Sequence, residues 1–387
     1  MPVVLKDVVF SGSATSSFDI TPGTLVASGP EQFTFVRPST EPKPGEPAPA
    51  EPRIKDKIQP FVEHSRLPYL LQETMPLRVG NRLYLFGGIT PLQGVVQSTD
   101  SILVANLDDQ GQLGTFTKVS DTHLVTPRHL GWATRLGDYV YVVGGFVGAK
   151  ESSATTTVER ARIAADGSLG AFELVSGVDL LSARGGFAYL NTGNWLYVTG
   201  GKPGSTGNSI GSTERAPVSP DGTVGTFEAA TPTLGTPRWS MPGVRIGNYF
   251  YLLGGETIVG SSESQLRTIE RSEVGADGTL GAFSTLSTQL SVARNRSGFA
   301  LLFDRIYLFG GFTGTGYLKQ LEQGTIGTDD TLSDFKASAD STLVQGLENG
   351  ITVAAGNSVY YIGGFNFSNQ QGMNLVQRAP ILVEVAQ

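Results

Sequence analysis

The sequence of 387 residues contains no cysteine, little charge and only three histidines. Without cysteine the chain cannot form disulfides, hold a metal through thiolates or use a cysteine nucleophile. Charged residues make up 16% of the chain, against about 25% in typical soluble domains. The formal net charge of −7 comes without any run of lysine and arginine, so we expect no nucleic acid partner, because phosphate binding needs clustered cations.

Long apolar runs are also missing. No stretch approaches 18 consecutive apolar residues, so we expect no membrane span. The first five residues lead directly into Lys6 and Asp7, which leaves no apolar core for a secretory signal peptide. These features leave the compartment open: the cytoplasm fits, and so does a virion or extracellular assembly reached without such a signal.

Glycine, in contrast, is abundant, and its pattern reveals a repeat. The chain has 50 glycines, about 13% of its residues, where about 7% is usual. Gly-Gly pairs recur six times at intervals of 53 to 57 residues, and a tyrosine stands three residues before each pair. The residues beside each tyrosine are apolar on both strand faces, which predicts a strand buried on both sides. The pairs begin at Gly87, Gly144, Gly200, Gly254, Gly310 and Gly363.

A second motif follows the first through the chain. Asp-Gly-x-Leu-Gly-x-Phe occurs at residues 166–172 and 277–283, and variants occur at 110–116, 221–227 and 329–335. The Asp-Gly step predicts a tight turn between two strands. The sixth unit ends before its own copy, but Ile58 and Phe61 keep the Leu-to-Phe spacing at the other end of the repeat region. We therefore expect this first segment to complete the last unit.

Six buried strands, with one unit completed from both ends of the chain, predict a closed ring. The fold class we expect is all-β, a six-bladed β-propeller, because radial closure leaves no long unpaired edge. Tyrosine followed by Gly-Gly at about 50-residue spacing resembles the kelch repeat family over roughly residues 55–387. That resemblance implies the fold and leaves the function open, because kelch propellers include enzymes and non-catalytic binding platforms.

The segment before the repeats has a different composition. Residues 38–54 form a linker, with six prolines among residues 38–52, which predicts an extended polyproline spacer. Residues 1–37 contain strand-like runs but too little apolar mass for a core of their own. We expect them to be an arm that becomes ordered against other subunits of an assembly, and the propeller to occupy 55–387.

The two faces of the ring are expected to differ. Short Gly-Asn or Gly-Asp connections and the Asp-Gly turns fall on one face, and long polar loops fall on the other. Recognition tends to lie on loops held by a rigid scaffold, so we expect the loop face to bind a protein or a glycan.

Four arginines stand sixteen residues before a Gly-Gly pair, where strand one begins near the axis. Two interpretations stay open for them. They form an anion site at the mouth of the ring, since arginine matches carboxylates, or they are structural clamps to carboxylates or carbonyls. Glu-Arg pairs recur on strand three and suggest ion pairs between neighbouring blades. The arginines are Arg128, Arg184, Arg238 and Arg294.

Three phenylalanines, Phe146, Phe312 and Phe365, stand two residues after the first glycine of their pairs, and Ile89 takes that place in the first unit. They form an apolar arc for a partner on the loop face, or they are strand ends packed into the blades. Lys202 and Glu256 hold the same position in the two remaining units.

No catalytic signature appears. The three histidines lack the spacing of a metal site, and the sequence has no nucleophile elbow, phosphate-binding loop or dinucleotide motif in a suitable context. We expect no cofactor, no metal and no enzymatic activity. The leading hypothesis is a binding module tethered by its arm to a larger assembly such as a virion. The alternatives are a cytosolic kelch adaptor and a sugar-processing enzyme resembling the six-bladed kelch sialic acid mutarotases.

Overall fold

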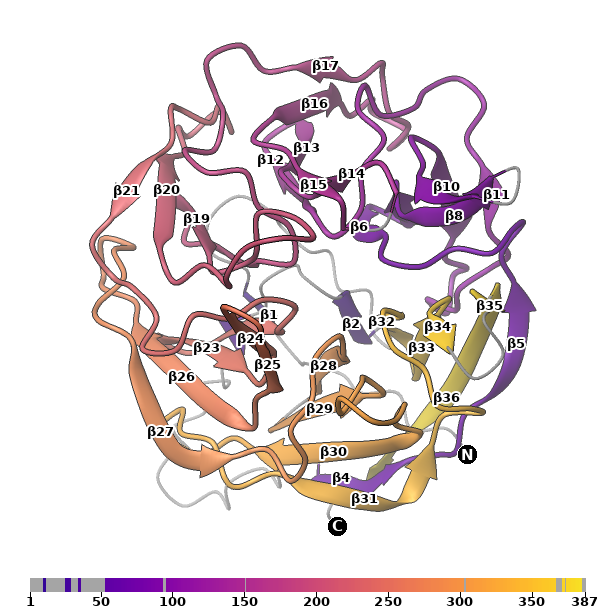
Figure 1. The fold of residues 1–387 in the computed structure, drawn as a ribbon. Helices are drawn as coiled ribbons and strands as arrows, with labels where there is room; N and C mark the ends of the chain where they lie inside the picture. Colours follow the sequence, from indigo (N-terminus) through magenta and orange to yellow (C-terminus); the bar gives the residue numbers. More distant parts are fainter. Residues whose placement is uncertain are drawn as a thin grey trace, which may run out of the picture.

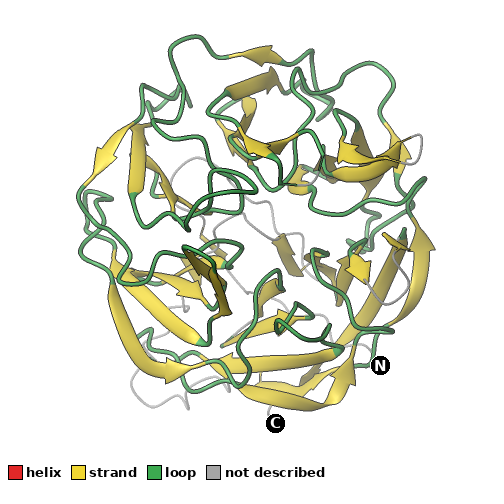
Figure 2. Ribbon diagram, in the orientation of Figure 1, coloured by secondary structure: helices red, strands yellow, loops and turns green. Residues whose placement is uncertain are grey.

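The computed structural model describes residues 53–92, 95–149, 151–302, 304–366, 371–372 and 374–384, with three short strands nearer the N-terminus. Five four-stranded antiparallel sheets and one six-stranded sheet form a ring around a central axis, which confirms the predicted six-bladed β-propeller (Figure 1). The described chain consists of strands and loops (Figure 2), and it contains no helix long and apolar enough to cross a membrane.

The strands of each blade follow one another outward from the axis. Blade 1 consists of β6 (Met75–Val79), β7 (Arg82–Phe86), β10 (Ile102–Asn106) and β11 (Thr117–Lys118). Blade 2 consists of β12 (Trp132–Leu136), β13 (Tyr139–Val143), β16 (Val158–Arg162) and β17 (Glu173–Leu174). Blade 3 consists of β18 (Ala188–Asn191), β19 (Trp195–Thr199), β20 (Thr213–Pro217) and β21 (Glu228–Ala230). Blades 4 and 5 are β22 (Gly243–Ile246), β23 (Tyr249–Leu253), β26 (Thr268–Glu273), β27 (Ser284–Gln289); and β28 (Gly298–Leu302), β29 (Arg305–Phe309), β30 (Gln320–Thr325), β31 (Lys336–Thr342).

Blade 6 is assembled from both ends of the chain. Its inner strands are β32 (Ile351–Gly356), β33 (Ser358–Ile362) and β36 (Leu375–Glu384), and β5 (Val62–Arg66) pairs with β36 as the fourth strand. Just before β5, the buried ring of Phe61 packs against Phe309 of blade 5. The predicted closure of the last blade by the first segment is therefore confirmed.

The N-terminal region is described only in part. Strand β4 (Arg53–Ile58) pairs with the end of β36, and β2 (Leu25–Ser28) pairs with β32 at the inner edge of blade 6. Strand β1 (Phe10–Ser11) pairs with β3 (Thr34–Phe35). The rest of the expected arm at 1–37, and the linker apart from residues 53 and 54, lie outside the described residues.

The repeated glycines hold neighbouring blades together. Gly87 and Gly88 have φ of +56° and +107°, a backbone region that favours glycine. The N–H of Gly88 donates to the carbonyl of Arg128, at the start of blade 2, at 2.8 Å. A Cβ on Gly87 would lie 2.2 Å from that same carbonyl oxygen, so only glycine allows this close approach.

The repeated tyrosines and Asp-Gly turns are also joined across blades. The hydroxyl of Tyr84 in blade 1 donates to the carbonyl of Gly167 in the turn of blade 2 at 2.9 Å. Tyr251 makes the same bond to Asp330 of blade 5 at 2.6 Å. Tyr197 makes the same bond to Gly278 of blade 4 at 3.3 Å, so in three of the blades the tyrosine satisfies its buried hydroxyl on the next blade's turn.

Four of the long loops on the other face contain small hairpins of their own. They are β8 (Ile89–Leu92) with β9 (Val95–Ser98), β14 (Phe146–Val147) with β15 (Ser153–Ala154), β24 (Glu256–Val259) with β25 (Ser262–Gln265), and β34 (Phe365–Asn366) with β35 (Gln371–Gly372). These hairpins bring additional side chains towards the axis on the loop face.

Candidate functional site

The four predicted arginines lie inside the blades, not at an open mouth. Arg128 is fully buried, and its guanidinium donates to the carbonyls of Gly144 and Thr157 at 2.8 and 3.0 Å. It also lies 2.7 Å from Oε1 of Glu159, which accepts a backbone N–H from Val125. The other buried pairs are Arg184 with Glu214, Arg238 with Glu270 and Arg294 with Glu322.

This arrangement matches the clamp interpretation and leaves no guanidinium of the four free for a ligand. Burial lowers the pKa of Arg128, and the charge of Glu159 opposes that shift. Each clamp ties the link that enters a blade to strand three of the same blade. The expectation that these Glu-Arg segments exchange ion pairs between neighbouring blades was therefore wrong. In blade 6, Leu347 stands in place of the arginine and Gln377 in place of the glutamate, so both charged partners of the clamp are replaced together.

The three phenylalanines begin the loops and pack inward to different degrees. Phe146 is fully buried, with its ring 6.2 Å from Trp239 and 5.5 Å from His129. Phe312 and Phe365 are half-buried, and Phe312 lies 5.2 Å from the ring of Tyr317. Phe146, at least, is part of the packing around the axis and not of an exposed patch.

A closed ring of backbone hydrogen bonds surrounds the axis on the loop face. Each blade contributes one residue, which stands two positions after the place of the clamp arginine, as Leu130 does after Arg128. All six of these residues have positive φ between 47° and 62°. The N–H of each donates to the carbonyl of the preceding member at 2.6 to 3.2 Å, and the sixth bond closes the circle. Because the backbone forms the ring, the side chains are free to differ: Glu73, Leu130, Gly186, Ser240, Arg296 and Asn349.

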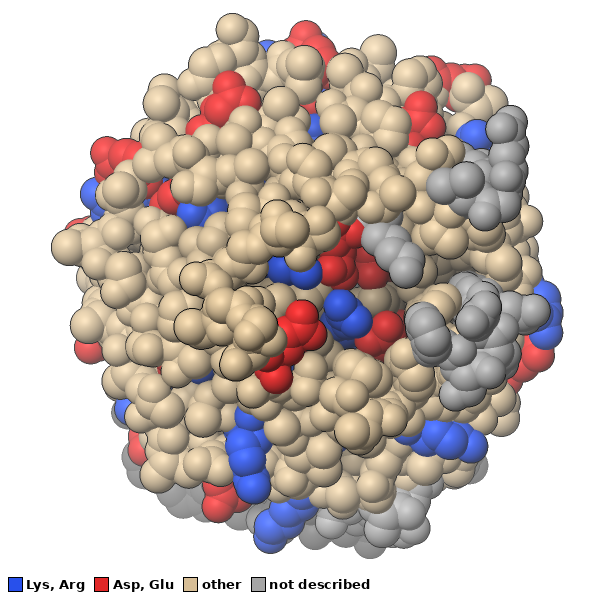
Figure 3. Space-filling view, in the orientation of Figure 1, with Lys and Arg blue, Asp and Glu red and all other residues tan. Residues whose placement is uncertain are grey.

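Charged side chains gather above this ring. Acidic and basic atoms lie together at the centre of the loop face in Figure 3. Besides Glu73 and Arg296 of the ring, they belong to Glu151, Lys202, Glu256 and Glu348, all buried or half-buried. We call these four residues and the six ring residues the axial funnel.

The cations of the funnel are fully engaged with its carboxylates. Arg296 lies 3.2 Å from Glu348 and 3.1 Å from Glu151. The other oxygen of Glu151 lies 2.7 Å from Nζ of Lys202, so this side chain of the β14–β15 hairpin reaches residues of blades 3 and 5. Asn295 donates to Glu256.

Burial acts on several glutamates of the funnel, most clearly on Glu73. Burial raises the pKa of Glu73 to about 8, and the charge of Glu151 adds to this shift. Burial also raises the pKa of Glu348, but Arg296 opposes that shift. Although burial alone would lower the pKa of Arg296, Glu348 and Glu151 hold it above its ordinary value. At neutral pH, therefore, the funnel contains a neutral carboxylic acid close to carboxylates paired with cations.

Aromatic and unpaired polar groups complete the site. Nζ of Lys202 lies 4.0 Å above the ring of Trp239, and the Arg296 guanidinium lies 5.0 Å from it. Among the described residues, Nε1 of Trp239 and the side-chain carbonyl oxygens of Asn295 and Asn349 are buried without a hydrogen-bond partner. Such groups are normally satisfied by water or a ligand.

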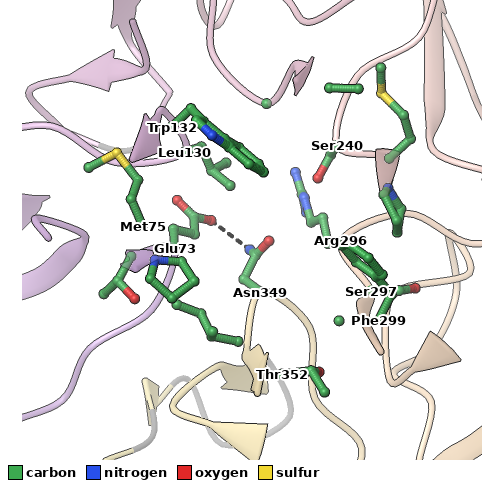
Figure 4. A pocket seen from close by; sticks show the side chains of 18 of the residues that line it. Glu73, Met75, Leu130, Trp132, Ser240, Arg296, Ser297, Phe299, Asn349 and Thr352 are labelled. Carbon is green, nitrogen blue, oxygen red and sulfur yellow. Dashed lines mark hydrogen bonds between the residues drawn. The ribbon is translucent and has the colours of Figure 1, made fainter. Parts of the chain in front are cut away.

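A cavity of about 160 Å³ follows the axis at the level of the ring (Figure 4). Asn349 donates to Glu73 across one side of it at 2.6 Å, drawn as a dashed line in that view. Arg296 and Ser240 lie on the opposite side. Its walls also include Met75, Trp132, Phe187, Met241 and Phe299, so it combines apolar surface with a few polar groups, as small-molecule sites do.

Sequence reasoning missed this funnel because it looked for residues that repeat. The six ring residues occupy a fixed place in every unit but differ from unit to unit. Lys202 and Glu256 were noticed only as gaps in an apolar arc. Variation at one position inside an otherwise regular repeat was the signal that could have found the site.

Comparisons with known proteins support the fold. No protein family model matches the chain, and no curated protein matches it. Among solved structures, the chain is similar to the one entitled "Structure of YjhT", with a TM-score of 0.62 and 12% identity over 83% of this chain and 99% of that chain. This likeness supports the propeller fold. The resemblance to kelch repeats rests on the sequence motifs alone.

The expectation that this chain has no enzymatic activity is corrected by these findings. It rested on the absence of a linear catalytic motif in the sequence. The chain shares its fold with YjhT over nearly the whole of that protein, and at its axis it brings together four glutamates from separate blades. The ring thus brings together acidic side chains from distant segments, a grouping that is invisible in any single segment.

Proposed function

We propose that the axial funnel binds a sugar and catalyses the opening and closing of its ring, the interconversion of anomers. The observation that carries this proposal is the position of the buried acid Glu73, whose pKa burial raises to about 8, beside the two carboxylates that pair with Arg296. Ring opening needs one group that gives a proton and one that takes a proton, at the same time and on the same ligand. This is also the activity implied by the resemblance to the six-bladed sialic acid mutarotases.

The reaction balances with the groups of the funnel alone. A carboxylate, Glu151 or Glu348, takes the proton of the anomeric hydroxyl, and the C–O electron pair forms a carbonyl. The bond from the anomeric carbon to the ring oxygen breaks, and that oxygen takes the proton of Glu73. Rotation about the next C–C bond and the reverse steps give the other anomer, so no redox partner or cofactor is consumed.

A sugar suits the remaining surface of the funnel. Trp132 and Phe299, which line the cavity, offer apolar faces, and Nε1 of Trp132 and Oδ1 of Asn349 offer one donor and one acceptor for hydroxyls. Since Lys202 and Arg296 are already paired, a neutral sugar enters without displacing Glu151.

The test is an exchange measurement on a panel of reducing sugars by NMR, comparing the wild-type protein with E73Q and E173Q. Glu173 is an exposed glutamate on an outer strand and serves as the matched control. We expect the wild type and E173Q to accelerate anomer exchange for at least one sugar, and E73Q to be slower by about 100-fold, the usual range for loss of a general acid. Equal rates for E73Q and wild type would contradict the assignment. E151Q and E348Q then distinguish the two candidate bases.

Attachment to a larger assembly has no support among the described residues and is not needed for this proposal. The one described arm strand with a partner in the propeller, β2, pairs with blade 6 of its own chain. Deletion of residues 1–52 tests the tether separately, because sugar turnover should survive it.

A further inference from the structure

A chain of hydrogen-bonding groups runs from Glu73 away from the funnel. Nε2 of His129 lies 3.5 Å from Oε2 of Glu73, and Nδ1 of His129 lies 2.8 Å from Oγ of Ser98. Oγ of Ser98 lies 3.0 Å from the carbonyl oxygen of Gly148, at the hairpin that carries Glu151. His129 is fully buried, and Ser98 and Glu73 are nearly so. Nothing in the proposed reaction uses His129, so its place in this chain needs its own explanation.

The direction of each bond follows from the groups at the two ends. The carbonyl of Gly148 can only accept, and it lies within reach of both the hydroxyl and the backbone N–H of Ser98. With the hydroxyl proton directed to Gly148, Ser98 accepts the proton on Nδ1 of His129, and a free lone pair stays on Nε2. At the other end, Asn349 donates to Oε1 of Glu73, so Oε2 is the oxygen left to carry a proton.

We propose that Glu73 and His129 share one proton between Oε2 and Nε2, with Glu73 as the donor, and that His129 is a positioning residue for this acid. Nε2 is buried and has no other partner among the described residues. The separation of 3.5 Å exceeds a normal hydrogen bond, but such contacts are often long without ligand and shorten when one binds. The role of Glu73 as the acid of the reaction rests on the proposed function, whereas the position of the proton between Glu73 and His129 does not.

The surrounding charges agree with this placement of the proton. Burial raises the pKa of Glu73 to about 8; Glu151 and Glu348 add to the shift, while Arg296 and Lys202 oppose it. Burial lowers the pKa of His129 to about 4, against the pull of Glu151. Between these values a neutral histidine faces a neutral acid.

Nitrogen-15 NMR of the histidines tests the arrangement directly, because the chain has only three of them. At pH 6.5 we expect His129 to show a protonated Nδ1 and an unprotonated Nε2, and the signals of exposed His123 serve as a reference in the same spectrum. An imidazolium at His129, or a proton on Nε2, would overturn the proposal. In S98A the fixed tautomer should be lost, since Nδ1 no longer has its acceptor.

The coupling to Glu73 has a second readout. In H129F the neutral acid loses its acceptor, so the pKa of Glu73, followed by carbon-13 NMR, should fall by about one pH unit. H129Q keeps an acceptor oxygen and should restore most of that shift. If H129F folds and leaves the Glu73 titration unchanged, His129 only fills space. These measurements need no substrate, so failure of the anomer-exchange test would leave them interpretable.

Discussion

At the scale of single residues, the buried arginine clamps carry a large desolvation penalty and take no part in the proposed reaction. Each guanidinium is removed from water and is compensated by one glutamate and by carbonyls of its own blade. Breaking such a pair leaves one charge buried without a partner, which is more damaging than removing both.

The clamp of blade 4 allows this to be measured. R238M should lower the free energy of unfolding by about 3 to 5 kcal/mol, because Glu270 is then buried alone. The double variant R238M/E270L should recover a large part of that loss. Urea unfolding of the single and double variants checks the prediction, and anomer exchange by the folded R238M protein should stay near the wild-type rate. A selective loss of turnover would return Arg238 to the list of functional residues.

Glu73 gives stability a pH dependence of known sign. Its pKa is about 8 in the folded chain and near the ordinary 4.5 in the unfolded chain. Between these values the folded state holds more protons, so stability falls as the pH rises from about 4.5 to about 8. Glutamine cannot ionise, and E73Q should therefore be more stable than wild type at pH 8, by a few kcal/mol, since each pKa unit is worth about 1.4 kcal/mol.

The measurement is thermal or urea unfolding of both proteins from pH 5 to pH 9. The His129 contribution is lost as the pH falls from 6.5 to about 4, so the two proteins are compared above pH 6.5, where it does not enter. Parallel pH profiles would show that Glu73 keeps an ordinary pKa in the folded protein.

At the scale of elements, the short strand β5 closes the last blade of the ring. It supplies the fourth strand of blade 6, and Ile58 and Phe61 before it lie in the core shared with blade 5. Deleting residues 1–52 should leave the ring folded, with an unfolding midpoint within a few degrees of the full chain. Deleting residues 1–66 should abolish cooperative unfolding, because β36 then presents an open edge and the core between blades 5 and 6 loses two buried side chains.

Circular dichroism and calorimetry of the two truncated chains decide this point. A stable, cooperative fold without β5 would mean that the ring closes through other contacts. A loss of folding in the shorter truncation would instead assign a structural role to the N-terminal region, which pairs with blade 6 through β2.

The elements show what the sequence could predict and what it could not. The Gly-Gly pairs were predictable because the second glycine of each pair donates the same backbone hydrogen bond to the next blade, and several tyrosines repeat one bond to the next blade's turn. The ring residues were not predictable, because the ring is made by backbone hydrogen bonds. Their side chains therefore have no shared function that would produce a repeated residue in the sequence. The contact of Glu151 with Arg296 joins residues 145 positions apart, which no local pattern encodes.

At the scale of the whole molecule, the propeller places different chemistry on each side of its axis. Blades 5, 6 and 1 contribute Arg296, Asn349 and Glu73 to the ring, and blades 2, 3 and 4 contribute Leu130, Gly186 and Ser240. A ligand at the axis therefore meets polar groups on one side and small or apolar groups on the other. Closure of the ring turns residues from distant segments into one site with a defined orientation.

The measurement that tests the central claim most directly is anomer exchange by NMR with the full chain at pH 7, across neutral and acidic reducing sugars. The account predicts that at least one sugar exchanges faster with the wild type than with E73Q, and that E173Q behaves like the wild type. If no sugar exchanges faster with the protein than in buffer, the axial funnel is not a site of anomer interconversion and the proposed function is wrong.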